Sequence, residues 1–112
     1  MAGVRLDKPW QALTPETISA LAAELGVYQL ADAAGRVVRI GYAGGRTLFG
    51  LRSALQAELA AGGPATQFRT EVTAGYMSRY EELLMVHVAD FGSLPEGNAA
   101  DGARRLGRLS PG

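Results

Sequence analysis

The 112-residue chain contains no cysteine. This excludes a disulfide, a thiol nucleophile and a thiolate metal site. The chain has a single histidine, which excludes a metal site built from two histidines. It also has no excess of charge, because 11 basic side chains balance 11 acidic ones. Strong sequence-independent binding to nucleic acid needs several uncompensated phosphate contacts, so the neutral total weighs against it.

Long hydrophobic runs are also missing. The apolar runs are far shorter than a membrane span, and no signal-peptide pattern opens the chain. We therefore expect a cytoplasmic location and no membrane partner. The length fits one domain, and 47% hydrophobic with 20% charged residues is typical of a soluble globular protein.

A β-hairpin is the clearest local prediction. Alternation of apolar residues predicts strands over residues 27–31 and 37–42, and Asp32 and Gly35 supply the turn between them. Tyr28 and Leu30 should share one face of the first strand. In the second strand, strict alternation sends Val38, Ile40 and Tyr42 to one face and Val37 and Arg39 to the other.

Helices and one more strand complete the pattern. Thr14, Pro15 and Glu16 are typical of a helix start, and the short helix that they begin ends at Gly26. A second helix is predicted over residues 49–61, a third strand over 67–74 and a third helix over 76–91. Residues 1–13 are predicted to form an irregular arm whose Trp10 docks on the core.

The hairpin carries two tripeptides, Gly26-Val27-Tyr28 and Arg39-Ile40-Gly41. Together they resemble the motifs of the GIY-YIG nucleases, with Arg39 at the position of the second tyrosine. Later features of that family follow in the same order along the chain: Arg52 on the second helix, Glu81 on the third, and Pro95 with Asn98. The resemblance implies a single α+β domain over residues 14–98, with a small three-stranded, mainly antiparallel sheet flanked by helices, followed by a basic tail over 99–112.

The resemblance also implies roles for individual residues. The catalytic positions are Tyr28, Arg39, Arg52 and Glu81. Glu81 would hold one divalent ion, magnesium or manganese, that polarises the scissile phosphate of a nucleic acid. Asn98 would brace the site on the substrate-binding side. A lone domain of this kind is expected to obtain its specificity from a partner protein, and the oligomeric state stays open.

The basic side chains are concentrated locally. Four arginines stand between Asp32 and Glu58 with no acid among them: Arg36, Arg39, Arg46 and Arg52. We predict that Arg36 and Arg46 contact substrate phosphates. Arg46 follows a glycine-rich bend, which lacks the lysine and hydroxyl pair of a phosphate-binding loop and is more typical of a plain backbone turn.

Helical phase separates the two glutamates of the third helix. Its predicted apolar stripe runs from Tyr76 to Phe91; Glu81 falls at the margin of that stripe and Glu82 points away from it. Glu81 is therefore the predicted metal ligand, and a solvated glutamate pair is the alternative. His87 lies in the stripe with no second ligand at a suitable spacing, which favours a core histidine satisfied by backbone.

Arg39 decides between function classes. An arginine stays protonated and offers no acceptor, so it can bind a phosphate oxygen but cannot act as a general base. Tyr28 and Tyr42 are the remaining candidates for that role. We therefore predict weak or absent cleavage with phosphate binding retained. Three classes stay open: a metal-dependent endonuclease, a relative that binds nucleic acid without cutting it, and a structural or protein-interaction domain.

Overall fold

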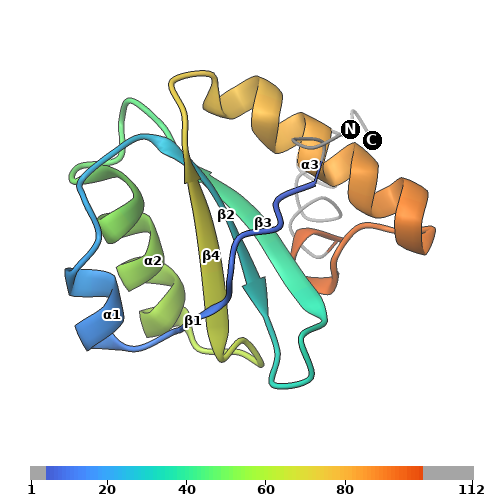
Figure 1. Cartoon of the computed structure of the whole chain (residues 1–112), viewed down its shortest axis with the longest axis horizontal. Helices are drawn as coiled ribbons and strands as arrows, with labels where there is room; N and C mark the ends of the chain where they lie inside the picture. The colour runs from blue at the N-terminus through green and yellow to red at the C-terminus, as the bar shows by residue number, and fades with distance from the viewer. Residues whose placement is uncertain (1–4, 100–112) are drawn as a thin grey trace, which may run out of the picture.

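The computed structural model describes residues 5–99 of the chain (Figure 1). Most of the predicted basic tail, residues 100–112, therefore lies outside the described residues. The elements follow in the order β1 (Gln11–Ala12), α1 (Pro15–Ser19), β2 (Gly26–Ala31), β3 (Val37–Ala43), α2 (Gly50–Ala61), β4 (Gln67–Val72) and α3 (Tyr76–Phe91). The α+β prediction is confirmed.

The strands form one antiparallel sheet in the order β1-β4-β2-β3. Three of them are the predicted strands. The fourth, β1, belongs to the arm that we expected to be irregular, and it pairs Gln11 with Phe68 and Ala12 with Gln67. Two residues carry too little alternation to be recognised as a strand in the sequence.

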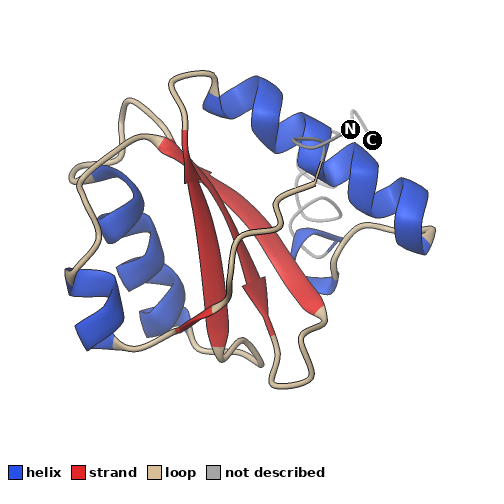
Figure 2. Cartoon of the chain, viewed as in Figure 1, coloured by secondary structure: helices blue, strands red, loops and turns tan. Residues whose placement is uncertain are grey.

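Helices cover both faces of the sheet. In Figures 1 and 2, α1 and α2 lie on one side of it and α3 on the other. Each face has its own core. The α2 side is built around Tyr28, Leu30, Leu51, Leu55 and Phe68, and the α3 side around Leu6, Val27, Ile40 and Leu83.

The signals for the start of α1 and for the hairpin turn behave as predicted, but α1 ends at Ser19 and does not reach Gly26, which is the first residue of β2. Thr14 caps α1, because the backbone N–H of Thr17 donates to its hydroxyl at 3.3 Å. In the hairpin, Asp32 Oδ1 accepts the backbone N–H groups of Ala34 and Arg36 at 3.0 and 2.9 Å. Gly35 takes the left-handed conformation, with φ +88°. These short-range interactions fix the register between β2 and β3.

One prediction about the hairpin is wrong. A register shift follows the Leu30–Arg39 pair: Ala31 pairs with Val37, and Val38 is left as an extra residue. This is a β-bulge, which places neighbouring side chains on the same face. Val38 therefore packs in the α2-side core, away from Ile40, and Arg39 also reaches α2.

The buried line of α3 is also shifted from the predicted stripe. Leu83 and Arg79 are its buried side chains, whereas Met77, Val88 and Phe91 at the other margin are exposed. The cause is Arg79, whose charge hides a buried position from a hydrophobic pattern. None of the helices in residues 5–99 combines the length with the hydrophobicity that a membrane-spanning segment requires.

Candidate functional site

Tyr28 lies in the middle strand β2 directly opposite Gly41 of β3, so the two tripeptides meet in register. A Cβ at position 41 would lie 2.3 Å from the Tyr28 ring. Tyr28 is only 4% exposed and belongs to the core on the α2 side of the sheet. Glycine at position 41 therefore leaves the space that the tyrosine needs to reach across β3 toward α2.

Glu58, near the end of α2, accepts two hydrogen bonds on one carboxylate oxygen. The Tyr28 hydroxyl donates a hydrogen bond to Glu58 Oε2, and Arg39 Nε donates to the same atom at 2.7 Å. The Glu58 side chain is 15% exposed and that of Arg39 is 30% exposed. We call these three residues the Tyr28–Glu58–Arg39 cluster. Sequence reasoning missed Glu58, because nothing in a regular helix pattern marks which glutamate faces a strand.

The environment keeps Tyr28 protonated. Burial of the ring, followed by the charge of Glu58 and the hydrogen bond to it, raises the pKa of the Tyr28 phenol well above its ordinary value, and Arg39 opposes this shift only in part. Tyr28 is therefore a hydrogen-bond donor in the folded protein. It does not supply a phenolate.

Asn98 braces β3, which is an edge strand of the sheet. Its side chain accepts the N–H of Ile40 at 2.7 Å and donates to the Ile40 carbonyl at 2.8 Å, as a neighbouring strand would. The preceding residue, Gly97, accepts a hydrogen bond from Arg39 Nη1 at 3.2 Å. A hollow of about 430 Å³ lies beside Arg39, Glu58 and Gly97. Asn98 itself is 6% exposed, and its amide serves the backbone of Ile40.

The other three arginines of the basic stretch do not converge on this cluster. Arg52 donates from Nε and Nη2 to the carbonyl of Leu21 at 2.9 and 2.8 Å, which ties α2 to the segment after α1. Arg36 is exposed and lies 3.5 Å from Asp32 Oδ2 and 4.0 Å from Glu96 Oε2. Arg46 is exposed on the loop between β3 and α2. Of the positions implied as catalytic, Tyr28, Arg39 and Arg52 lie on the α2 side of the sheet.

Glu81 and Glu82 lie on α3, across the sheet from Tyr28. Glu81 is exposed. Glu82 Oε1 accepts from Arg79 Nη1 at 2.6 Å, and Arg79 also pairs with Glu71 of β4 at 2.9 and 3.0 Å. The position at the margin of the buried face thus falls to Glu82, contrary to the helical-phase prediction, because Arg79 draws that carboxylate toward β4.

Residues 5–99 do not provide a preformed site for a divalent ion. In the described part of the chain, no three His, Cys, Asp or Glu side chains come together in a way that could hold a metal. Glu81 stands alone, and the carboxylate of Glu58 already accepts from Tyr28 and Arg39. A single exposed carboxylate can hold magnesium only together with other oxygen ligands, such as substrate phosphates.

His87 lies on α3 with its ring centroid 4.6 Å from that of Phe91. It is half-buried and lines a groove, so the prediction of a core histidine held by backbone does not describe its surroundings. Burial lowers the pKa of His87, and Asp90 opposes this shift.

Comparison with known proteins places the chain in one family. No curated protein and no solved structure matches it. The model of a family described as "Domain of unknown function (DUF7508)" matches residues 4–90, a range that includes the Tyr28–Glu58–Arg39 cluster and ends before Asn98. Because the match covers most of the sequence, this chain belongs to the DUF7508 family.

Proposed function

We propose that this protein is a GIY-YIG-like domain that binds nucleic acid without hydrolysing it at an appreciable rate. The observation that carries the proposal is the Tyr28–Glu58–Arg39 cluster. At the two positions where the resembled family has tyrosines, this chain has a buried phenol that donates to a carboxylate and a guanidinium that pairs with the same carboxylate.

Phosphodiester hydrolysis needs a group that takes a proton from the attacking water. Tyr28 is held as a donor, Arg39 has no acceptor, and Glu58 already accepts from both of them. Tyr42 lies on the α3 side, where its ring packs on Tyr76 and Tyr80. Loss of general-base help typically costs about 10² to 10⁴ in rate. Glu81, across the sheet, could support metal binding only through phosphates of the substrate.

Exposed arginines support the binding half of the proposal. Arg36 on the hairpin and Arg46 on the loop after β3 are exposed and stand outside the Tyr28–Glu58–Arg39 cluster. Arg46 has no ion pair within residues 5–99, whereas a phosphate at Arg36 would compete with the exposed carboxylates of Asp32 and Glu96. Each phosphate contact contributes about one unit to the dependence of log affinity on log salt, so two contacts give modest affinity and a shallow slope. A partner protein that supplies specificity fits such a weak intrinsic interaction.

The test is a cleavage and binding assay with magnesium or manganese on single- and double-stranded DNA and RNA. The wild type should bind in a salt-dependent way and leave the substrate intact. Arg39→Tyr, which restores an acceptor, should raise metal-dependent nicking, and Arg46→Tyr, the same change at an exposed arginine, should not. A wild type that cuts briskly, and loses this activity in Glu81→Gln, would establish an endonuclease instead.

A second candidate is a protein-interaction domain. The exposed margin of α3 presents Met77, Met85 and Val88 to solvent, and methionines are common on adaptable binding surfaces. Absence of binding to any nucleic acid at low salt would favour this candidate over the first.

A further inference from the structure

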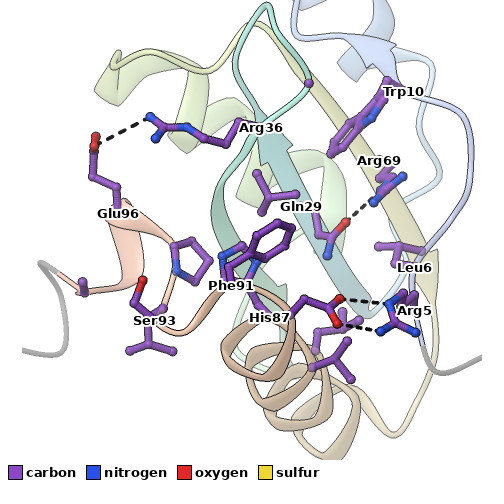
Figure 3. A pocket seen from close by; sticks show the side chains of 18 of the residues that line it. Arg5, Leu6, Trp10, Gln29, Arg36, Arg69, His87, Phe91, Ser93 and Glu96 are labelled. Carbon is purple, nitrogen blue, oxygen red and sulfur yellow. Dashed lines mark hydrogen bonds and ion pairs between the residues drawn. The ribbon is translucent and has the colours of Figure 1, made fainter.

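A groove of about 920 Å³ lies on the α3 side of the sheet, opposite the Tyr28–Glu58–Arg39 cluster. Its walls are formed by the N-terminal arm, β2, β4, the hairpin turn before β3, the second half of α3 and the segment that follows α3 (Figure 3). Its volume is within the range of small-molecule sites in proteins. Neither the resemblance nor the family assignment gives this groove a role.

Gln29 lies at the base of the groove with one half of its amide unused. The residue is only 7% exposed, and its Oε1 accepts from Arg69 Nε at 2.7 Å, which fixes the orientation of the amide. Its Nε2 has no acceptor among residues 5–99, and it is not sealed from solvent. Figure 3 shows this nitrogen turned into the groove. A nine-tenths buried amide donor therefore faces the space that a ligand would occupy.

Arg69 adds a second donor on the same wall. Its guanidinium carbon lies 4.1 Å from the centroid of the Trp10 ring, and its Nη1 donates to the carbonyl of Lys8 at 3.3 Å. The remaining nitrogen, Nη2, has no acceptor in the described part of the chain. The two side-chain nitrogens of this wall that have no partner within residues 5–99, Gln29 Nε2 and Arg69 Nη2, are both hydrogen-bond donors.

Flat apolar surface faces these donors. Phe91 is 70% exposed and packs on His87, and Figure 3 shows its ring toward the middle of the groove, with Trp10 on the far wall. Aromatic rings provide a stacking surface for planar ligands. Such a surface has no evident use in a groove that binds a small inorganic anion.

The charge at the rim is nearly balanced. Arg5 pairs with Asp90 at 2.6 Å, and Arg36 lies 4.0 Å from Glu96. Three arginines and two carboxylates line the groove, and the third arginine, Arg69, interacts electrostatically with Asp7. This balance suits a neutral or singly charged planar group better than a polyphosphate.

We propose that the groove binds a guanine base, stacked on the exposed ring of Phe91, with O6 and N7 accepting from Gln29 and Arg69. Guanine is the base whose major-groove edge presents two neighbouring acceptors, whereas adenine presents an acceptor beside a donor. The base can come from a free nucleotide or from an unpaired position in a single strand. The second source rests on the proposed nucleic-acid binding, and the first does not.

Trp10 is the only tryptophan, so its fluorescence reports on the groove directly. Titration of the full chain with GMP, AMP and CMP, corrected with free tryptophan amide, should show saturable quenching by GMP, with affinity at least about tenfold above that for AMP. Equal response to GMP and AMP, or no response to either, would overturn the proposal.

Gln29→Glu tests the donor without removing the partner of Arg69, because a carboxylate can still accept from its Nε. This variant should weaken GMP binding at least about tenfold, whereas the matched change Gln56→Glu, on α2 and exposed, should not. If circular dichroism shows that Gln29→Glu is poorly folded, Phe91→Ala can be used instead. It removes the exposed ring and should also weaken the binding of GMP.

Labelled single strands with one guanine or none separate the two proposals. Binding of GMP without binding of any strand would support guanine binding in the groove and refute the proposed function. Strand binding whose affinity changes neither with the guanine nor with Gln29→Glu would support the proposed function and refute guanine binding in the groove.

Discussion

Tyr28 and Gly41 face each other across β2 and β3 so closely that a Cβ on Gly41 would lie 2.3 Å from the Tyr28 ring. The pair explains why the second tripeptide ends in glycine here: the side chain missing from β3 makes room for the tyrosine that reaches Glu58. The hydrogen bond between Tyr28 and Glu58 therefore depends on glycine at position 41 of β3.

Gly41→Ala should displace the Tyr28 ring and break its hydrogen bond to Glu58. Overpacking and a lost bond to a charged group together should lower the free energy of unfolding by about 2 to 4 kcal/mol, measured by urea denaturation. Gly45→Ala is the control, because no atom lies within 4 Å of a Cβ there. A Gly41→Ala variant as stable as wild type would show that Tyr28 moves aside freely.

The Tyr28 phenol should make stability fall at high pH. Its pKa is raised in the folded state, so the unfolded chain releases this proton first, from about pH 10. The contribution is fully present below that pH and is lost as the pH rises toward the folded value. In an ultraviolet titration, Tyr28 should ionise only as the protein unfolds. Tyr28→Phe should remove this part of the alkaline loss, and an unchanged alkaline profile in that variant would contradict the assignment.

Asn98→Ala should destabilise the edge of the sheet. It leaves the N–H and carbonyl of Ile40 without their partner, at a cost of about 2 to 4 kcal/mol in the free energy of unfolding. Hydrogen exchange at the Ile40 amide should accelerate in parallel. Glu96→Ala, two residues earlier and exposed, should change stability by less than about 0.5 kcal/mol. Equal effects of the two changes would mean that Asn98 does not brace β3.

Replacing an acidic partner of Arg79 should destabilise the protein more than replacing Glu81. Glu71→Gln breaks a two-bond pair with a buried guanidinium, and Glu82→Gln breaks a half-exposed pair. Glu81→Gln breaks no ion pair within residues 5–99. Thermal unfolding should therefore rank the loss as Glu71→Gln largest, Glu82→Gln smaller and Glu81→Gln near zero. A large loss in Glu81→Gln would reveal a structural role for that carboxylate.

Most of the fold follows from short-range signals in the sequence. The bounds of α3 agree with the prediction, and the hairpin turn forms through Asp32 and Gly35 as its chemistry requires. The sequence could not indicate β1, which is too short to show alternation, or the bulge at Val38, because an extra residue breaks the period of two without changing composition.

The candidate site was less predictable, because it depends on which charges meet across elements. In the sequence, Glu58 looks like an ordinary polar residue of a helix and Arg79 like a solvated arginine. Their roles become visible only in the folded structure, where Glu58 pairs with Arg39 of β3 and Arg79 pairs with Glu71 of β4. Ion pairs between distant elements have no periodic signature. Resemblance alone could not show that Arg52 turns to the Leu21 carbonyl or that Glu81 lies across the sheet from Tyr28.

We propose that this protein binds nucleic acid but does not cut it, and binding and cleavage can both be measured in one sample. Labelled single-stranded DNA would be titrated with protein in the presence of manganese, followed by fluorescence anisotropy at several salt concentrations, and then run on a denaturing gel. We predict saturable binding that weakens as salt rises, with full-length DNA on the gel. Shortened DNA would show that the protein is a nuclease, and no change in anisotropy at low salt would show that it does not bind DNA.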